Sequence, residues 1–351
     1  MPRAPTTPAA TRRSGMDQVW SVTGPIGPDD LGLTLPHEHV FANLTPTESR
    51  DGFMTVWEER ERDIRRFVER GGRTLWDVTN GELSDYAAPI YYDRDPAHQV
   101  QNPVTGSRSV ANVLATKEMA ERTGVNIILG TGHYFEAYLD QDWWERNSVN
   151  QIADYLVADL LDEIPGTGVR AGLLGEIASD RPKITANEER SFRAAGRAAV
   201  ETGVLVSTHA PTFPTGEAQI DILTAEGVDP ERIVIGHTDT VKDVRYSIDL
   251  LNRGVYIQYD CMMACKVGGQ VAVAELRRRV DYLKHLVDRG FAAKILLSQD
   301  VSQRSHQAEF GGPGMCFLFE EFAEYAVAAG IEPEVLTMMT VDNPRRAMFG
   351  R

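Results

Sequence analysis

Short apolar runs alternate with longer amphipathic stretches along most of the chain. Each run is too short for a helix and nearly all apolar, which is the pattern of a strand buried on both faces. The runs occupy residues 33–40, 74–80, 126–134, 171–178, 204–210, 233–239, 255–260 and 295–300.

The stretches between the runs have helix signals. The clearest is 187–203, "NEERSFRAAGRAAVETG". Thr185 and Glu188 stand at capping-box spacing at its start, and Gly203 stands at its end. Gly124 closes an earlier helix in the same way.

Eight strand–helix units in succession predict an α/β fold, the (β/α)8 TIM barrel. A doubly wound open sheet is the alternative. It has little support, because no glycine-rich dinucleotide fingerprint follows the first strand.

Composition narrows the function classes. The chain has 351 residues, 42% of them hydrophobic, and can therefore bury a large core. Its net charge of -15 argues against nucleic acid or an anionic membrane as a partner. No apolar run approaches the length of a membrane span.

The three cysteines are too few for a disulfide framework and predict a reducing, cytoplasmic location. Cys261 and Cys265, in "CMMAC", have no second pair and are interpreted as ordinary thiols. Residues 1–15 lack a hydrophobic export region, so we expect a disordered tail before a single domain over 16–351. Met16 is an alternative start.

The first run, within "LTLPHEHVFANL", contains His37 and His39. Side chains two residues apart on a strand share a face, so both imidazoles should point into the barrel at its catalytic mouth. Two neutral imidazoles pack poorly there but are good ligands for one metal ion.

Other strands end in polar residues at the same place: Glu176, His209, His237 and Asp300. A single buried histidine is more often a hydrogen-bonded core residue, and a single carboxylate is more often a helix cap. Six such residues at the ends of five strands argue against coincidence. They are too many for one tetrahedral zinc with an open position, and suit two ions about 3.5–4 Å apart.

These residues lie in motifs that resemble the phosphotriesterase family of the amidohydrolase superfamily. The resemblance runs from about Val22 to Arg351 and includes "GPIGPDDLGLTLPHEH", "GTGHY", "STHA", "GHTD", "SQD", "FGGPG" and "DNPRRAMFG". It implies two ligand sets that share Glu176, namely His37, His39 and Asp300 in one, and His209 and His237 in the other.

Glu176 stands where the phosphotriesterases and lactonases of the family have a carboxylated lysine. A glutamate there is similar to the branch of the phosphotriesterase homology proteins and related animal proteins. The difference argues against pesticide hydrolysis but leaves metal binding in place. We expect two divalent ions, zinc first, although manganese or cobalt would fit the same ligands.

The resemblance and the ligands together imply a hydrolase of small molecules. A hydroxide bridging the two ions would attack the carbonyl of an ester, lactone or N-acyl amide. Asp300 would take the proton and pass it to the leaving group. A phosphotriester hydrolase, a metal-dependent lyase or decarboxylase, and a non-catalytic metal-binding protein stay open.

Further residues lie near the expected mouth. Tyr134 matches a family position whose tyrosine lines the pocket, and it could hydrogen-bond the substrate or only pack. Asn80 could shape the pocket, and Arg304 and His306 could bind an anionic substrate group.

The segment around 84–107 is longer than in related chains. It follows the second strand, at the face where substrate specificity is usually built. It could close over a substrate or form a dimer contact. The resemblance implies a homodimer.

Overall fold

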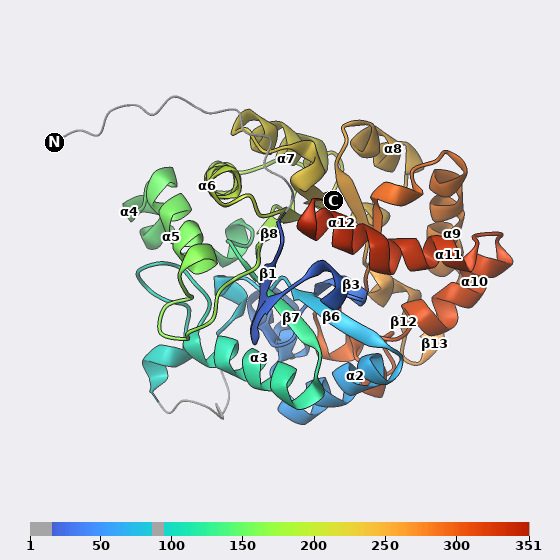
Figure 1. Cartoon of the computed structure of the whole chain (residues 1–351), viewed down its shortest axis with the longest axis horizontal. Helices are drawn as coiled ribbons and strands as arrows, with labels where there is room; N and C mark the ends of the chain where they lie inside the picture. Colours follow the sequence, from blue (N-terminus) through green and yellow to red (C-terminus); the bar gives the residue numbers. More distant parts are fainter. Residues whose placement is uncertain (1–15, 86–94, 351) are drawn as a thin grey trace.

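Eight parallel strands, one from each predicted run, form the central sheet of the protein (Figure 1). The computed structural model describes residues 16–85 and 95–350. The strands are β3 (Leu33–Glu38), β6 (Gly72–Asp77), β7 (Asn126–Thr131), β8 (Leu173–Ala178), β9 (Val206–His209), β10 (Ile233–Ile235), β11 (Tyr256–Tyr259) and β14 (Ile295–Leu297). Their order is β3-β6-β7-β8-β9-β10-β11-β14, so neighbours in the sheet follow chain order, and the predicted TIM barrel is confirmed.

Helices follow the strands and surround the barrel (Figure 1). They are α1 (Thr45–Glu48), α2 (Trp57–Glu69), α3 (Val110–Thr123), α4 (Gln141–Arg146), α5 (Val149–Leu161), α6 (Ala186–Thr202), α7 (Thr215–Ala225), α8 (Val244–Asn252), α9 (Val273–Asp288), α10 (Ala323–Ala328), α11 (Pro333–Thr337) and α12 (Asn343–Phe349). Helix α6 begins with the predicted capping box between Thr185 and Glu188. Gly203 and Gly124 end their helices in the left-handed conformation, with φ of 79° and 75°.

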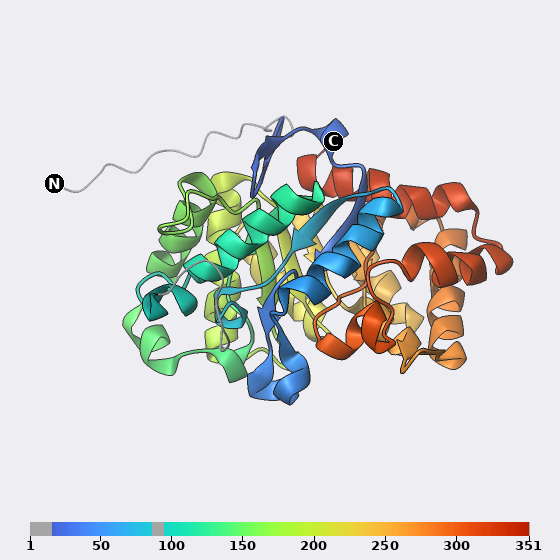
Figure 2. The same ribbon diagram turned by 90° about the horizontal axis from the view of Figure 1, so that it is seen from below.

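An apolar plug fills one end of the barrel. Buried side chains from seven strands or strand starts meet there, namely Trp76, Ile128, Leu173, Leu205, Val234, Tyr256 and Leu296. The hairpin of β1 (Val19–Ser21) and β2 (Gly24–Ile26) packs on this plug together with α12. Figure 2 shows the hairpin at one end of the barrel and the segment around α1 at the other. A small molecule therefore has to enter from the end where the strands finish.

Two short antiparallel strand pairs lie in the loops at the open end. They are β4 (Ala42–Asn43) with β5 (Phe53–Met54), and β12 (Lys266–Val267) with β13 (Gln270–Val271).

The first and last strands of the barrel are joined through Glu38, which is fully buried. One carboxylate oxygen accepts hydrogen bonds from the Ser298 hydroxyl and the Gln299 backbone N–H, both at 2.8 Å. The other accepts from the Val301 N–H at 3.0 Å. Burial raises the pKa of Glu38 to about 7, although these hydrogen bonds favour the charged form. Glu38 therefore links β3 to the segment after β14 that leads into the active-site loops.

No helix within residues 16–85 and 95–350 is long and apolar enough to cross a membrane. The three cysteines are free and buried. The cytoplasmic location and the homodimer stay predictions, and the expected tail over 1–15 lies outside the described residues.

Replacing Glu38 with Gln should lower the free energy of unfolding by about 1–3 kcal/mol, because the amide NH2 would face a buried N–H donor. Urea unfolding of the metal-saturated protein measures this effect. Glu309→Gln is the control, since Glu309 forms an exposed ion pair with Arg62, and it should cost less than about 1 kcal/mol. Equal losses in both variants would contradict a role for Glu38 in closing the barrel.

Candidate metal centre

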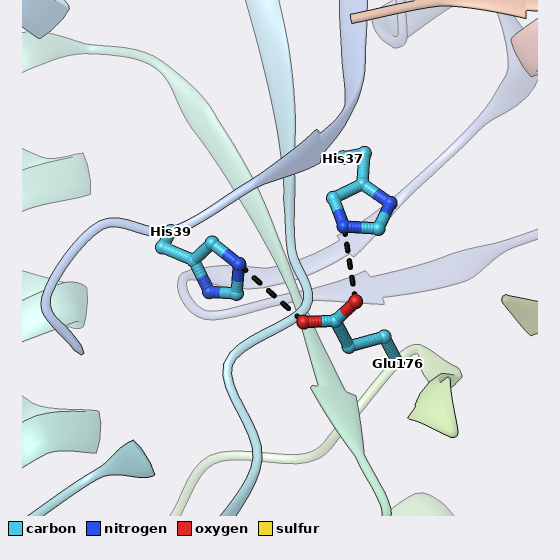
Figure 3. A group of neighbouring side chains, drawn as sticks. All are labelled: His37, His39 and Glu176. Atoms are coloured by element: carbon cyan, nitrogen blue, oxygen red, sulfur yellow. Dashed lines mark ion pairs between the residues drawn. The ribbon is translucent and has the colours of Figure 1, made fainter. Parts of the chain in front are cut away.

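Glu176, near the end of β8, lies at the centre of the predicted ligands and is 1% exposed. Its Oε2 lies 3.2 Å from Nε2 of His37, and its Oε1 lies 3.5 Å from Nε2 of His39 (Figure 3). Burial alone would raise the pKa of Glu176, but the His209 and His37 imidazoles lower it well below its usual value. The carboxyl is therefore ionised, and its two oxygens face two different histidines of β3 and the loop after it.

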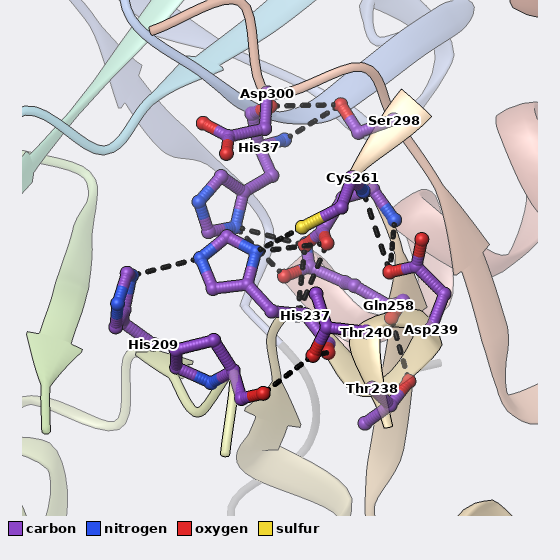
Figure 4. Close-up of polar contacts among 12 residues, drawn as sticks. His37, His209, His237, Thr238, Asp239, Thr240, Gln258, Cys261, Ser298 and Asp300 are labelled. Atoms are coloured by element: carbon purple, nitrogen blue, oxygen red, sulfur yellow. Dashed lines mark hydrogen bonds and ion pairs between the residues drawn. The ribbon is translucent and has the colours of Figure 1, made fainter. Parts of the chain in front are cut away.

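The second pair of histidines approaches the same carboxylate from β9 and from the segment just after β10. Nδ1 of His209 lies 3.0 Å from Glu176 Oε2, and Nε2 of His237 lies 3.5 Å from it. These two nitrogens are 2.8 Å apart (Figure 4). Asp300 completes the arrangement, with its Oδ1 3.4 Å from Nε2 of His39. The structure thus brings all six predicted ligands together.

Two groups of donors could each hold an ion, and they share Glu176. In each group the ligand atoms lie within 4.8 Å of one another. The groups are His37, His39 and Glu176, and Glu176, His209 and His237. A bridging carboxylate between two such groups is the arrangement expected of a two-metal site.

Hydrogen bonds fix the orientation of the histidine rings. Nδ1 of His37 lies 3.0 Å from Oε1 of Gln258, whose amide nitrogen donates to the Pro36 carbonyl. Nδ1 of His237 lies 3.0 Å from a carboxylate oxygen of Asp260. Because both acceptors require a proton on Nδ1, the two Nε2 atoms direct lone pairs toward Glu176.

These lone pairs provide a test of whether a cation fits. Nε2 of His37 is buried and has no hydrogen-bond partner among the described residues, yet it faces an ionised carboxylate. Burial lowers the pKa of His37, but Asp260 and Glu176 outweigh it and raise the pKa to about 9. The site therefore draws positive charge to this nitrogen, as a proton or as a metal ion that competes with it. Imidazole and carboxylate donors suit zinc, manganese or cobalt.

Two of the ligands have backbones in the left-handed region. His237 has a φ of 58° and Asp300 a φ of 50°. Residues other than glycine adopt this region at a cost of about 1–3 kcal/mol and do so mainly at functional sites. The two strand ends are thus bent so that both side chains reach the centre.

A cavity of about 470 Å³ opens over this centre and is lined in part by His209, His237 and Asp300. Tyr134 also lines it, and none of the described residues hydrogen-bonds its hydroxyl. His306 lies in the wall as well, and burial lowers its pKa. The expectation that Tyr134 and His306 lie at the mouth agrees with these positions.

Asn80 and Arg304 take other places. Asn80 is buried beside Glu176, and its amide nitrogen donates to the Glu176 carbonyl at 2.6 Å, so it supports a ligand and does not line the cavity. The guanidinium of Arg304 bonds Glu59 and lies 4.5 Å from the centre of the Phe310 ring. Arg304 is therefore held outside the cavity, contrary to the expectation that it would face the substrate.

Several residues of the site were not predicted. Asp260 and Gln258 belong to the seventh run, and a carboxylate at a strand end was the available signal for Asp260. Cys261 was interpreted as an ordinary thiol, but its sulfur lies 3.2 Å from Nδ1 of His237 and it lines the cavity. His133 points away from the cavity and pairs with Glu82 at 2.7 Å.

Comparison with known proteins places the chain among hydrolases. Residues 98–348 match the sequence model of the phosphotriesterase family. The phosphotriesterase homology protein of Escherichia coli is 27% identical, over 90% of this chain and 97% of its own. The N-acetyltaurine hydrolase of Mus musculus is 26% identical, over 94% and 97%. A variant of a phosphotriesterase-like lactonase from Deinococcus radiodurans superposes with a TM-score of 0.73 at 27% identity, over 94% and 99%.

Glu176→Ala should remove most of the bound metal, because both ligand groups lose their shared oxygen donors. Elemental analysis of the purified proteins checks this, with about two ions per chain expected for the unaltered protein. Glu48→Ala is the control, since Glu48 is a carboxylate of the same cavity outside both groups. Unchanged metal content in Glu176→Ala would rule out the bridge.

Proposed function

Since this chain belongs to the phosphotriesterase family, we propose that it is a two-zinc hydrolase that cleaves a carbonyl bond in a small N-acyl amide, ester or lactone. The observation that carries the proposal is the buried Glu176 carboxylate, which two groups of imidazole ligands share beside a cavity lined by His209, His237 and Asp300. His37, His39 and Asp300 would hold one ion and His209 and His237 the other. When bound, the ions would lower the pKa of the attacking water and polarise the carbonyl oxygen.

Asp300 is placed to accept the proton of the attacking water. Burial alone would raise the pKa of Asp300, but contact with His39 and the charges of His237 and His37 lower it, so the carboxyl is ionised. It lines the cavity directly above the ligand histidines and is 7% exposed. A carboxylate in this position takes a proton and returns it to the leaving group in the next step.

Tyr134 is placed to bind the substrate. Burial and the charges of Glu176 and Asp300 raise the pKa of Tyr134 well above its usual value, so the hydroxyl keeps its proton. Its ring packs against His209 with centroids 5.2 Å apart. The free hydroxyl can therefore donate a hydrogen bond to an oxygen of the substrate or of the tetrahedral intermediate.

The rim of the cavity holds one cation that could bind an anionic group of the substrate, beside the carboxylates of Glu48, Glu136, Asp180 and Glu188. Arg181, in the loop after β8, is exposed and lines the cavity, and no described carboxylate forms an ion pair with it. An arginine in this state can bind a carboxylate or sulfonate at the far end of an N-acyl compound. The similarity to the mouse N-acetyltaurine hydrolase and to the bacterial lactonase, which are both named for cleavage at a carbonyl, supports this substrate class.

Asp300→Asn should reduce kcat by about 10²–10⁴-fold, because the amide cannot accept the proton. Much of the metal should stay bound through the remaining ligands, so kcat and metal content are measured on the same samples. Gln303→Ala, in the same loop and cavity wall, is the control and should keep most of the activity. Near-normal turnover in Asp300→Asn would exclude the proton role.

Arg181→Gln should raise KM for N-acyl amino acids and N-acyl sulfonates about five- to tenfold and leave neutral esters and lactones unaffected. Lys183→Gln is the control, because Lys183 is exposed in the same loop but does not line the cavity.

The assay is run in ¹⁸O-water, in which a hydrolase places the label in the acid product. Label-free product would indicate a lyase, and preferential turnover of phosphotriesters would contradict the carbonyl substrate.

A further inference from the structure

A chain of buried polar side chains runs outward from His39, away from the cavity. It consists of His39, Thr79, Asp77 and Arg108, and we call it the relay. Nδ1 of His39 lies 3.0 Å from the Thr79 hydroxyl, which donates to Asp77 Oδ1 at 2.6 Å. The other Asp77 oxygen accepts a hydrogen bond from the Arg108 guanidinium at 2.9 Å. All four side chains are buried, none being more than 2% exposed. Buried polar groups in such a chain are sensitive to the loss of any one member.

The direction of each hydrogen bond follows from the donors available. A hydroxyl has one proton, and that of Thr79 is directed to the acceptor-only carboxylate of Asp77. The Thr79 oxygen must then accept a hydrogen bond from the N–H at Nδ1 of His39. Nε2 of His39 is left with a lone pair, which points between carboxylate oxygens of Asp300 and Glu176 at 3.4 and 3.5 Å.

Arg108 also holds the backbone that carries His39. Its Nε donates to Oδ1 of Asn112 at 3.2 Å, and the Asn112 amide donates to the carbonyl of Phe41 at 2.9 Å. The guanidinium thus compensates the buried charge of Asp77 and, through Asn112, ties α3 to the segment after β3.

The base of the loop over 84–107 fixes the position of Arg108. The N–H of Ser109 donates to the Ser84 hydroxyl at 2.8 Å, and the Ser109 hydroxyl donates to the Ser84 carbonyl at 2.7 Å. These bonds join the two ends of the loop directly beside Arg108. Residues 86–94 of this loop lie outside the described residues.

We propose that Thr79, Asp77 and Arg108 are positioning residues that keep the proton of His39 on Nδ1 and so set the metal affinity of the site formed by His37, His39 and Asp300. The inference rests on the proposed two-metal function. His209 and His237 have no contact with the relay, so the affinity of the second site should not depend on it.

Thr79→Val tests the proposal, because valine has nearly the shape of threonine and lacks the hydroxyl. Metal is removed from the full chain, and zinc affinity is measured by competition with a chromophoric chelator. One of the two sites should weaken by about 10–100-fold in Thr79→Val while the other changes little. Thr79→Ser restores the hydroxyl and should restore the affinity.

Thr74→Val is the matched control. Thr74 lies on β6, the strand that ends at Asp77, and is fully buried. The substitution removes its hydroxyl hydrogen bond to the Leu31 carbonyl but none of the hydrogen bonds of the relay. It should leave both zinc affinities unchanged. Wild-type affinity at both sites of a folded Thr79→Val, or equal weakening in Thr74→Val, would overturn the relay.

A second measurement keeps the relay separate from the proposed function. Long-range ¹H–¹⁵N correlation spectra of the zinc-loaded protein, with ¹⁵N-labelled histidine, show which ring nitrogen of His39 carries the proton. A protonated Nδ1 is expected, and a protonated Nε2 would overturn the relay even if both ions bind. If Thr79→Val does not fold, Asp77→Asn takes its place, with the same loss of affinity expected at one site. Absence of zinc binding by the unaltered protein would contradict the proposed function itself.

Discussion

The structure is organised around one electrostatic constraint, the burial of the Glu176 carboxylate in the mouth of the barrel. An ionised carboxylate removed from water needs positive charge or hydrogen-bond donors close to it. Four imidazoles surround it, and in His37, His39 and His237 the nitrogen that faces away from the carboxylate is paired with an acceptor. Around the histidines the protein therefore places a ring of acceptors, namely the amide of Gln258, the carboxylate of Asp260 and the hydroxyl of Thr79. These acceptors hold the protons of the three rings on the outward-facing nitrogens, so the inward-facing nitrogens present lone pairs, and a cation between them and Glu176 would supply the positive charge that the carboxylate needs.

The two ends of the barrel have different roles, one in stability and the other in chemistry. At one end, bulky apolar residues and the β1–β2 hairpin exclude water and supply the packing that stabilises the sheet. At the other, nearly every strand ends in a charged or hydrogen-bonding side chain, at a cost in desolvation and in backbone strain at His237 and Asp300. Glu38 joins these roles, since its carboxylate closes the sheet between two metal-ligating segments. Stability and chemistry thus meet at the seam of the barrel.

The sequence predicted the strands and the meeting of the six candidate ligands well, because both depend on local rules. A short apolar run becomes a buried strand wherever it falls, and side chains at spacing two must share a face, which is enough to bring His37 and His39 together. The supporting residues were out of reach because their partners are distant in the chain, with Gln258 meeting His37 across 221 positions. Arg304 is the reverse case, a residue that was predicted to face the substrate and does not. Its place in a loop after the last strand suggested the cavity, but Glu59 on α2, far away in sequence, pairs with it.

The paired hydrogen bonds between Ser84 and Ser109 close a loop on itself at its stem. This stem separates the outer part of the loop from the residues at its base. Because Arg108 stands directly before Ser109, the stem also holds Arg108, and through Asp77 and Thr79 the imidazole of His39, in place. A change at either serine would therefore alter the position of a candidate metal ligand as well as that of the loop.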